Sequence, residues 1–188
     1  MRDGFVKVAA GTPKIRVADC RYNAEQIFTL MREADKQGVK VLALPELCLT
    51  GYTCGDLFLH DRLVRGALEG LKAVLEKTRE VDMLMIVGLP VADGNCLYNC
   101  AAVLQGGHVL GVVPKTHLPN YAEFYELRQF APAFEGRRAL HWFGEEVPFA
   151  ADLLFACREL PEFIVGVEIC EDLWAPLPTG VKLALSED

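Results

Sequence analysis

The sequence predicts a layered fold of the α/β or α+β class. Short runs rich in valine, leucine and isoleucine alternate with longer stretches in which apolar residues recur every three or four positions, a pattern typical of helices packed on a sheet. Of the 188 residues, 52% are hydrophobic and 24% are charged, so there is enough apolar material for a core of ordinary size. These proportions exclude a disordered or collagen-like chain.

The first half of the chain is expected to alternate strands with helices. Residues 5–10 are predicted to form a strand, and an extended piece at 15–18 leads to Asp19, a residue type that caps helices. An amphipathic helix is predicted over 22–37, and Gly38 ends it. The patterns then predict a buried strand at 39–44, a second amphipathic helix at 63–80 and a strand at 83–88.

The second half is expected to contribute mainly strands. Residues 97–104 and 108–113 flank the pair Gly106-Gly107, which predicts a hairpin, and two further strands are predicted at 152–157 and 163–169. No internal repeat or linker interrupts this order, so residues 1–188 are interpreted as one domain. We expect this domain to be incomplete at its C-terminal end, because little chain remains after the last predicted strand.

Charge and hydropathy make several partners poor candidates. The chain has 19 basic and 26 acidic residues, a net charge of −7, so there is no positive excess to bind nucleic acid or an anionic membrane surface. The longest apolar stretch, residues 83–92, contains Gly88 and Pro90 and is shorter than the roughly 20 residues that cross a bilayer. The N-terminus has no signal-peptide pattern, so we expect a cytoplasmic location.

The cysteine content fits a reducing compartment. Seven cysteines leave at least one thiol unpaired, and no cysteine pair has nearby histidines in the pattern of a structural zinc site, so no metal is expected. Most of the six other than Cys170 are interpreted as small core residues: Cys20, Cys48, Cys54, Cys96, Cys100 and Cys157.

Three reactive side chains follow three predicted buried strands. Glu46 comes after V-K-V-L-A-L-P, Lys115 after V-L-G-V-V-P and Cys170 after F-I-V-G-V-E-I. In layered α/β folds, side chains from the carboxyl ends of several strands converge on one site. The three residues are therefore expected to meet despite their separation in the sequence.

A carboxylate, an ammonium and a thiol together can cleave an amide. A thiol with a pKa near 8.5 needs a base or a neighbouring cation, and Glu46 can be that base. Attack on an amide carbonyl places negative charge on oxygen, which the Lys115 ammonium and a backbone N–H near Cys170 can stabilise. The same residues also fit solvated loop charges and an inert core cysteine, so these residue types alone leave both interpretations open.

Three longer strings resemble a known family. L-P-E-L-C-L-T-G-Y-T-C-G-D-L-F contains Glu46, P-K-T-H-L-P-N-Y-A-E-F-Y-E-L-R-Q-F contains Lys115, and V-G-V-E-I-C-E-D-L-W contains Cys170. In this order they resemble the catalytic blocks of the nitrilase, or carbon-nitrogen hydrolase, superfamily. Within it, they are most similar to the glutamine-hydrolysing N-terminal domains of glutamine-dependent NAD synthetases. The resemblance runs from about Val6 to about Pro178.

The resemblance implies a nitrilase-like α-β-β-α sandwich, truncated at its C-terminal end, and a Glu-Lys-Cys triad. It makes Cys170 the nucleophile that forms a thioester, Glu46 the general base and Lys115 the stabiliser of the tetrahedral intermediate. Glu126 matches a second active-site glutamate, although Glu123 is close enough in the sequence to compete for that role.

The resemblance also implies a glutamine pocket. Its residues would be Tyr52, Tyr121, Glu171 and Trp174, although each aromatic residue among them can serve simple packing instead. His117 lies two residues after Lys115 and invites a Cys/His interpretation, but the family pattern gives it no catalytic part.

The function implied is hydrolysis of the glutamine side-chain amide, with the ammonia supplied to NAD synthesis. The partners implied are glutamine, a synthetase domain that this chain does not contain, and further copies of the chain in a homo-oligomer. No cofactor is expected for the glutaminase step, and ATP and deamido-NAD are expected only at the synthetase domain. Two alternatives remain: a stand-alone amidase acting on another small amide, and a catalytically silent fragment that serves as an interaction surface.

Overall fold

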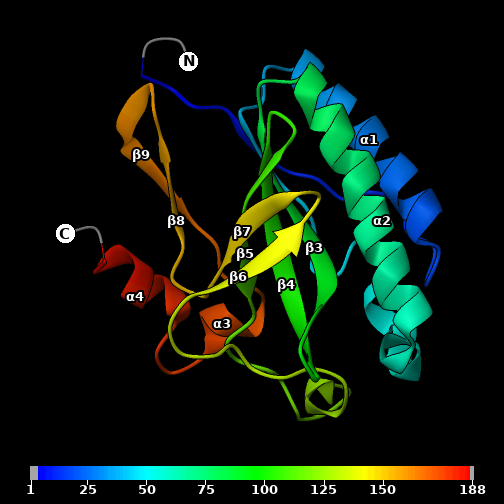
Figure 1. Cartoon of the computed structure of the whole chain (residues 1–188). Helices are drawn as coiled ribbons and strands as arrows, with labels where there is room; N and C mark the ends of the chain where they lie inside the picture. Colours follow the sequence, from blue (N-terminus) through cyan, green and yellow to red (C-terminus); the bar gives the residue numbers. More distant parts are fainter. Residues whose placement is uncertain (1–3, 187–188) are drawn as a thin grey trace.

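A central seven-stranded sheet organises the chain (Figure 1), and the computed structural model describes residues 4–186. The strands lie in the order β1-β2-β3-β4-β5-β7-β6. Their bounds are Val8–Ala10 (β1), Val41–Ala43 (β2), Leu84–Asp93 (β3), Cys96–Gln105 (β4), His108–Pro114 (β5), Arg138–Trp142 (β6) and Glu145–Phe149 (β7).

Two long helices cover one face of this sheet and lie side by side in Figure 1. Helix α1 spans Cys20–Lys36 and helix α2 spans Asp61–Lys77, which confirms both predicted helices to within a few residues at each end. Asp19 caps α1 as predicted, because its carboxylate accepts a hydrogen bond from the N–H of Tyr22 at 3.1 Å. The apolar face of each helix is buried, so the amphipathic spacing identified the packing faces correctly.

A two-stranded hairpin lies over the opposite face of the sheet (Figure 1). It consists of β8, Leu154–Cys157, and β9, Leu160–Gly166. A small second core on this face includes Val103, Val113 and Ile169. Helices, central sheet and hairpin form successive layers, as the predicted fold class requires.

Strand direction determines where the candidate site forms. Strand β2 runs parallel to β3, whereas β4 is antiparallel to both β3 and β5. Strands β2 and β5 therefore run the same way, and their carboxyl ends reach the same edge of the sheet. The turn at Gly106-Gly107 joins β4 to β5 as predicted, and both glycines have positive φ, +59° and +88°.

The structure differs from the sequence-based expectations in several places. The extended piece predicted at 15–18 ends in a turn at residues 17–18, where Ala18 has a φ of +62°. The strand predicted at 163–169 is instead 160–166, because the following residues leave the hairpin to pack against the sheet. Strands β6 and β7 were not predicted, since charged residues interrupt these two short runs. The last residues of the helix predicted at 63–80 form a separate short helical segment, Thr78–Glu80 (η2). Four other short helical segments were not predicted: Tyr52–Leu59 (η1), Glu126–Arg128 (η3), Glu171–Trp174 (α3) and Thr179–Ala184 (α4). Within residues 4–186, no helix is both long and apolar enough to span a membrane.

Candidate active site

Lys115 lies at the centre of the candidate site, with its side chain completely buried. It directly follows β5, and its backbone N–H donates to the carbonyl of Asn99 on β4 at 2.8 Å. Its Nζ donates to Oε1 of Glu46 at 2.6 Å and to both carboxylate oxygens of Glu126, at 2.8 and 3.0 Å. A buried ammonium requires such partners, because leaving it unpaired in a protein interior is very unfavourable.

Glu46 reaches Lys115 from a turn that follows β2 and lies against β3. A side chain on Gly88 of β3 would collide with this turn, since a Cβ there would come within 2.4 Å of the Leu47 nitrogen and 2.6 Å of the Pro45 oxygen. The absence of a side chain at Gly88 therefore lets the turn approach the sheet closely enough to direct Glu46 toward β5.

Asn99 provides a second donor to the same oxygen of Glu46. Its Nδ2 lies 2.6 Å from Glu46 Oε1, and the Asn99 side chain is buried in the middle layer of the fold. Within residues 4–186 the other oxygen, Oε2, accepts no hydrogen bond. One oxygen of Glu46 is thus held by two donors, and the other is available to take a proton.

Glu126, not Glu123, is the second glutamate beside Lys115. Glu126 lies on η3 and is 5% exposed, whereas Glu123 is on the surface. Tyr52 donates its hydroxyl hydrogen bond to Oε1 of Glu126 at 2.7 Å. Tyr52 therefore contacts the buried carboxylate in addition to packing near Phe124.

Cys170 occupies a strained turn between β9 and α3. Its backbone has φ +48° and ψ −99°, a region that side-chain-bearing residues rarely adopt. The side chain is exposed rather than packed in the core, unlike Cys20, Cys48, Cys54 and Cys100. The interpretation of most other cysteines as core residues is correct for those four, whereas Cys96 is exposed and Cys157 is half-buried.

A cavity of about 430 Å³ connects Cys170 with Glu46, and both residues line its wall. Glu168, Gly88 and Cys100 also contribute to this wall. The structure thus brings Glu46, Lys115 and Glu126 into direct contact and places Cys170 on the same cavity as Glu46. Among the described residues, no three histidine, cysteine, aspartate or glutamate side chains are grouped so as to hold a metal ion.

The electrostatics of this group keep the Cys170 thiol protonated and make Glu46 a stronger base. Burial and the charge of Glu46 raise the pKa of the Cys170 thiol, and Lys115 offsets only part of that rise. Burial also raises the pKa of Glu46, against the opposing effect of Lys115. Burial disfavours the Lys115 charge, but the neighbouring glutamates outweigh burial and raise its pKa, so the ammonium keeps its proton at neutral pH. The thiol is therefore protonated at rest and needs a base.

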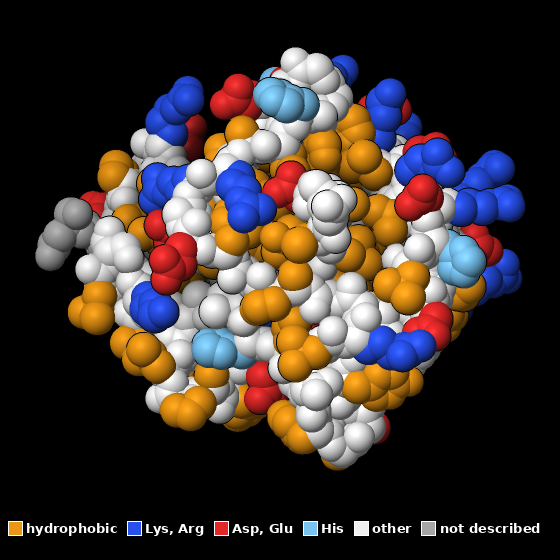
Figure 2. All heavy atoms as spheres, turned by 60° about the horizontal axis from the view of Figure 1, so that its bottom comes forward, with side chains coloured by type: hydrophobic (Ala, Val, Ile, Leu, Met, Phe, Trp, Pro, Cys, Tyr) orange, Lys and Arg blue, Asp and Glu red, His pale blue; other side chains and the backbone are white. Residues whose placement is uncertain are grey.

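The remaining predicted site residues lie at the rim. Tyr121 donates its hydroxyl hydrogen bond to Oε2 of Glu171 at 2.9 Å, which joins the loop after β5 to the residue next to Cys170. Trp174, at the end of α3, is 72% exposed. Figure 2 shows the molecule from the side of these loops, with hydrophobic side chains over the middle of the face and most lysines and arginines toward its edges.

Two buried polar residues of the site were given no role from the sequence. Asn99 contacts Glu46 and Lys115, and Asp172 accepts hydrogen bonds from the loop that follows Lys115. For Asn99 the available signal was a polar residue in the apolar run Y-N-C-A-A-V-L, whereas Asp172 follows the charged Glu171 in I-C-E-D-L-W and carried no such signal. Neither string indicates which distant group the polar side chain contacts.

Comparison with known proteins identifies the family. The model of the carbon-nitrogen hydrolase family matches residues 7–185, which is nearly the whole chain. The chain therefore belongs to the carbon-nitrogen hydrolase family. This agrees with an arrangement in which a carboxylate contacts a buried ammonium beside a cavity that an exposed cysteine lines.

Within this family, the chain is similar in sequence to glutamine-dependent NAD(+) synthetases. The chain is 39% identical over 183 residues to the glutamine-dependent NAD(+) synthetase of Mycobacterium tuberculosis, covering 97% of this chain and 27% of that protein. It is 32% identical over 171 residues to the Thermotoga maritima protein of the same name, covering 91% of this chain and 26% of that protein. The chain thus spans about a quarter of the length of these relatives.

Solved structures agree with these sequence matches. The glutamine-dependent NAD(+) synthetase of Cytophaga hutchinsonii has a TM-score of 0.79 at 30% identity, over 88% of this chain and 28% of that chain. An amidase from Nesterenkonia has a TM-score of 0.61 at 23% identity, over 80% of this chain and 56% of that chain, and this match shows the shared fold.

Proposed function

We propose that this chain hydrolyses the side-chain amide of glutamine and that the ammonia supports NAD synthesis. The observation that carries the proposal is the 2.6 Å contact between Lys115 and Glu46 beside the cavity that Cys170 lines. The substrate is suggested by relatives named glutamine-dependent NAD(+) synthetase.

In the first step, Glu46 removes the proton from Cys170. Oε2 of Glu46 is the acceptor, because Oε1 already accepts from Lys115 and Asn99. The thiolate sulfur then bonds to the side-chain amide carbon of glutamine, and the carbonyl π electrons move onto oxygen. The product of this step is a tetrahedral intermediate attached to Cys170.

Lys115 stabilises the negative oxygen of that intermediate. Two of its three hydrogen bonds go to the single carboxylate of Glu126, so one N–H can serve both of those oxygens. A second N–H serves Glu46, which leaves the third for the developing oxyanion. The buried position strengthens this interaction, because water does not screen the charge there.

Collapse of the intermediate releases ammonia and leaves a thioester. Glu46 returns the proton to the leaving nitrogen as the carbon–nitrogen bond breaks. Water then attacks the thioester carbon, Glu46 takes a proton from that water, and the carbon–sulfur bond breaks as the proton passes to the sulfur. Glutamate leaves, and Cys170 and Glu46 return to their starting states.

The rim residues would hold the amino-acid part of glutamine. Glu171 adjoins Cys170, and its carboxylate is oriented by Tyr121, so it is suited to bind the α-ammonium group. Trp174 and Tyr52 would provide apolar walls. The released ammonia would pass to a synthetase domain, as the name glutamine-dependent NAD(+) synthetase of the longer relatives suggests. We expect ATP and deamido-NAD to bind at that domain and not at this one.

Trapping of the thioester tests the proposal. The full chain is mixed with glutamine, quenched in acid and weighed by intact-protein mass spectrometry. We expect a glutamyl adduct that is absent from Cys170→Ala and present in Cys100→Ala, a matched control because Cys100 lines the same cavity. No adduct, or an adduct that persists in Cys170→Ala, would contradict the proposal, and faster acylation by another small amide would indicate a stand-alone amidase.

A further inference from the structure

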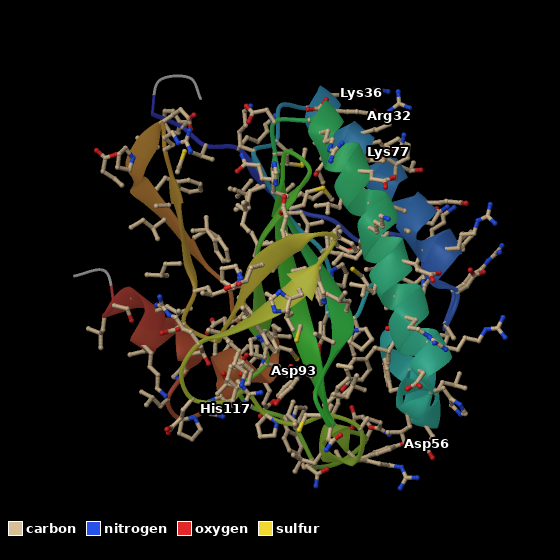
Figure 3. All side chains as sticks on the ribbon, viewed as in Figure 1. Arg32, Lys36, Asp56, Lys77, Asp93 and His117 are labelled. Atoms are coloured by element: carbon tan, nitrogen blue, oxygen red, sulfur yellow. The ribbon has the colours of Figure 1, made fainter. Side chains whose placement is uncertain are left out.

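Asp172 connects two distant parts of the site through backbone hydrogen bonds. Its side chain, in α3, is 1% exposed. Oδ1 accepts from the N–H of Thr116 at 3.0 Å and of His117 at 2.7 Å, and Oδ2 accepts from the N–H of Ile169 at 3.1 Å. Figure 3 shows His117 on the loop next to α3. One carboxylate therefore joins the loop after β5 to the turn before α3.

Both bonded segments carry a residue of the proposed triad. Thr116 directly follows Lys115, and Ile169 directly precedes Cys170. The N–H of Asp172 also donates to the carbonyl of Ile169 at 3.1 Å. Residues 169–172 thus form a turn closed by two hydrogen bonds, with Cys170 inside it.

The backbone of Cys170 requires this kind of restraint. A cysteine with positive φ is strained, and strained conformations persist only where the surrounding structure holds them. The two hydrogen bonds between Ile169 and Asp172 hold the residues on either side of Cys170. Without them, the turn is free to relax toward an ordinary conformation and to move the sulfur.

Packing alone does not account for an aspartate at this position. Burial raises the pKa of Asp172, against the opposing hydrogen bonds from His117, Ile169 and Thr116, so the charged form is disfavoured by its surroundings. An apolar side chain of similar volume would fill the same space without that penalty. Only a carboxylate has the two acceptor oxygens that serve all three N–H groups.

We propose that Asp172 is a positioning residue, which holds the Cys170 turn and the Lys115 loop in the relative arrangement that acylation requires. This inference rests on the proposed glutaminase function. Asp172 acts through the backbone of these two segments, since its carboxylate is already occupied by their N–H groups.

Asp172→Asn should keep the hydrogen bonds to the loop after Lys115 and break the hydrogen bond to the turn that contains Cys170. The amide oxygen can keep the bonds from Thr116 and His117, but the amide nitrogen would then face the N–H of Ile169, so two donors would oppose each other. We expect the acylation rate with glutamine to fall about 10²-fold, the scale for a reacting group displaced by about 1 Å. Alkylation of Cys170 by iodoacetamide should fall far less, because this small reagent needs a deprotonated sulfur but not the Lys115 ammonium that stabilises an oxyanion.

The control is Asp152→Asn, which makes the same chemical change in an exposed ion pair with Arg137. Asp172→Ser is the second variant, because a small hydroxyl avoids the donor–donor contact if the asparagine variant does not fold. Slow acylation with a far smaller loss of alkylation in a folded variant supports the proposal. Acylation at the wild-type rate, an equal loss of both reactions, or failure of both variants to fold would overturn it. Absence of acylation in the wild type would instead overturn the proposed function, and this inference with it.

Discussion

Nζ of Lys115 lies 2.6 Å from Oε1 of Glu46, although 69 positions separate the two residues in the sequence. Glu126 contacts the same ammonium, so two carboxylates and one ammonium meet in a buried space. This group carries one net negative charge when all three are ionised. Removing the ammonium and removing a carboxylate therefore have opposite electrostatic effects on a negative charge that forms beside this group, whether on the sulfur or on the substrate oxygen.

Lys115→Gln should reduce acylation more than it reduces substrate binding. The substitution keeps a hydrogen-bond donor of similar length but removes the positive charge, so the oxyanion loses its main stabilisation. Loss of one good oxyanion donor lowers the rate about 10²- to 10³-fold, and we expect at least that effect. Single-turnover acylation at saturating glutamine measures it, with Lys40→Gln, in an exposed ion pair, as the control. A loss below about threefold would contradict this role.

The same variant should lose stability in a pH-dependent way. Without Lys115, Glu46 and Glu126 remain buried without a cation, and breaking a buried ion pair typically lowers the free energy of unfolding by about 3–5 kcal/mol. Lys115 also lowers the pKa of Glu46, so its removal raises that pKa further. A raised pKa in the folded state means that the folded protein takes up a proton as the pH falls. The destabilisation should thus be larger at about pH 7.5 than at about pH 5, as measured by urea unfolding, and equal losses at both would refute it.

Glu46→Gln should respond differently to pH. This variant lacks the base for the Cys170 thiol, whose pKa lies above its ordinary value. The acylation rate should therefore fall strongly at neutral pH and recover in part as the pH approaches the thiol pKa. Acylation rates against pH for this variant and for Lys115→Gln provide the test. If high pH restores the lysine variant and not the glutamate variant, the two roles are reversed.

Asn99→Leu should shift the pH profile without removing the base. Asn99 donates to Oε1 of Glu46, so loss of this donor raises the pKa of Glu46. The other charged or titratable groups near Glu46 are Lys115, Glu126 and the Cys170 thiol, and the substitution leaves them in place. The pH below which the acylation rate falls should move upward, while the rate at higher pH stays close to that of the wild type. Oδ1 of Asn99 has no partner among the described residues, so the substitution leaves no donor unpaired there. If the acylation rate instead falls by the same factor at every pH, Asn99 supports the structure without setting the pKa of Glu46.

The sequence was informative where a pattern is local. Apolar spacing predicts α1 and α2, because one face of each helix must be buried, and Gly106-Gly107 predicts the β4–β5 hairpin, because its turn needs two residues with positive φ. The meeting of Glu46 with Lys115 was also predictable, since each follows a strand and the two strands run the same way.

The position of β7 and the partners of Asn99 and Asp172 depend on long-range contacts that no local sequence pattern specifies. Strand β7 joins the sheet beside β5 through the pair Val112 and Phe149, and its run E-E-V-P-F has too few apolar residues to indicate a strand. Asn99 is a single polar residue in an apolar run, which indicates burial, whereas Asp172 directly follows the charged Glu171, which does not. Neither context shows that the partners of these residues are Glu46 and the loop after Lys115.

Glu171→Gln should slow the turnover of glutamine but not of amides that lack an α-ammonium group. Tyr121 orients the Glu171 carboxylate through a 2.9 Å hydrogen bond, and the proposed function gives that carboxylate the ammonium of glutamine. A hydrogen bond between charged groups contributes about 2 kcal/mol, so kcat/KM for glutamine should fall roughly 30-fold, mainly through KM. Turnover of a short uncharged amide such as butyramide should be unchanged, because it makes no use of the carboxylate. Glu123→Gln is the matched control, since Glu123 is exposed on the same loop as Tyr121. Equal losses for both amides would show that Glu171 supports the Cys170 turn rather than binding the ammonium group of the substrate.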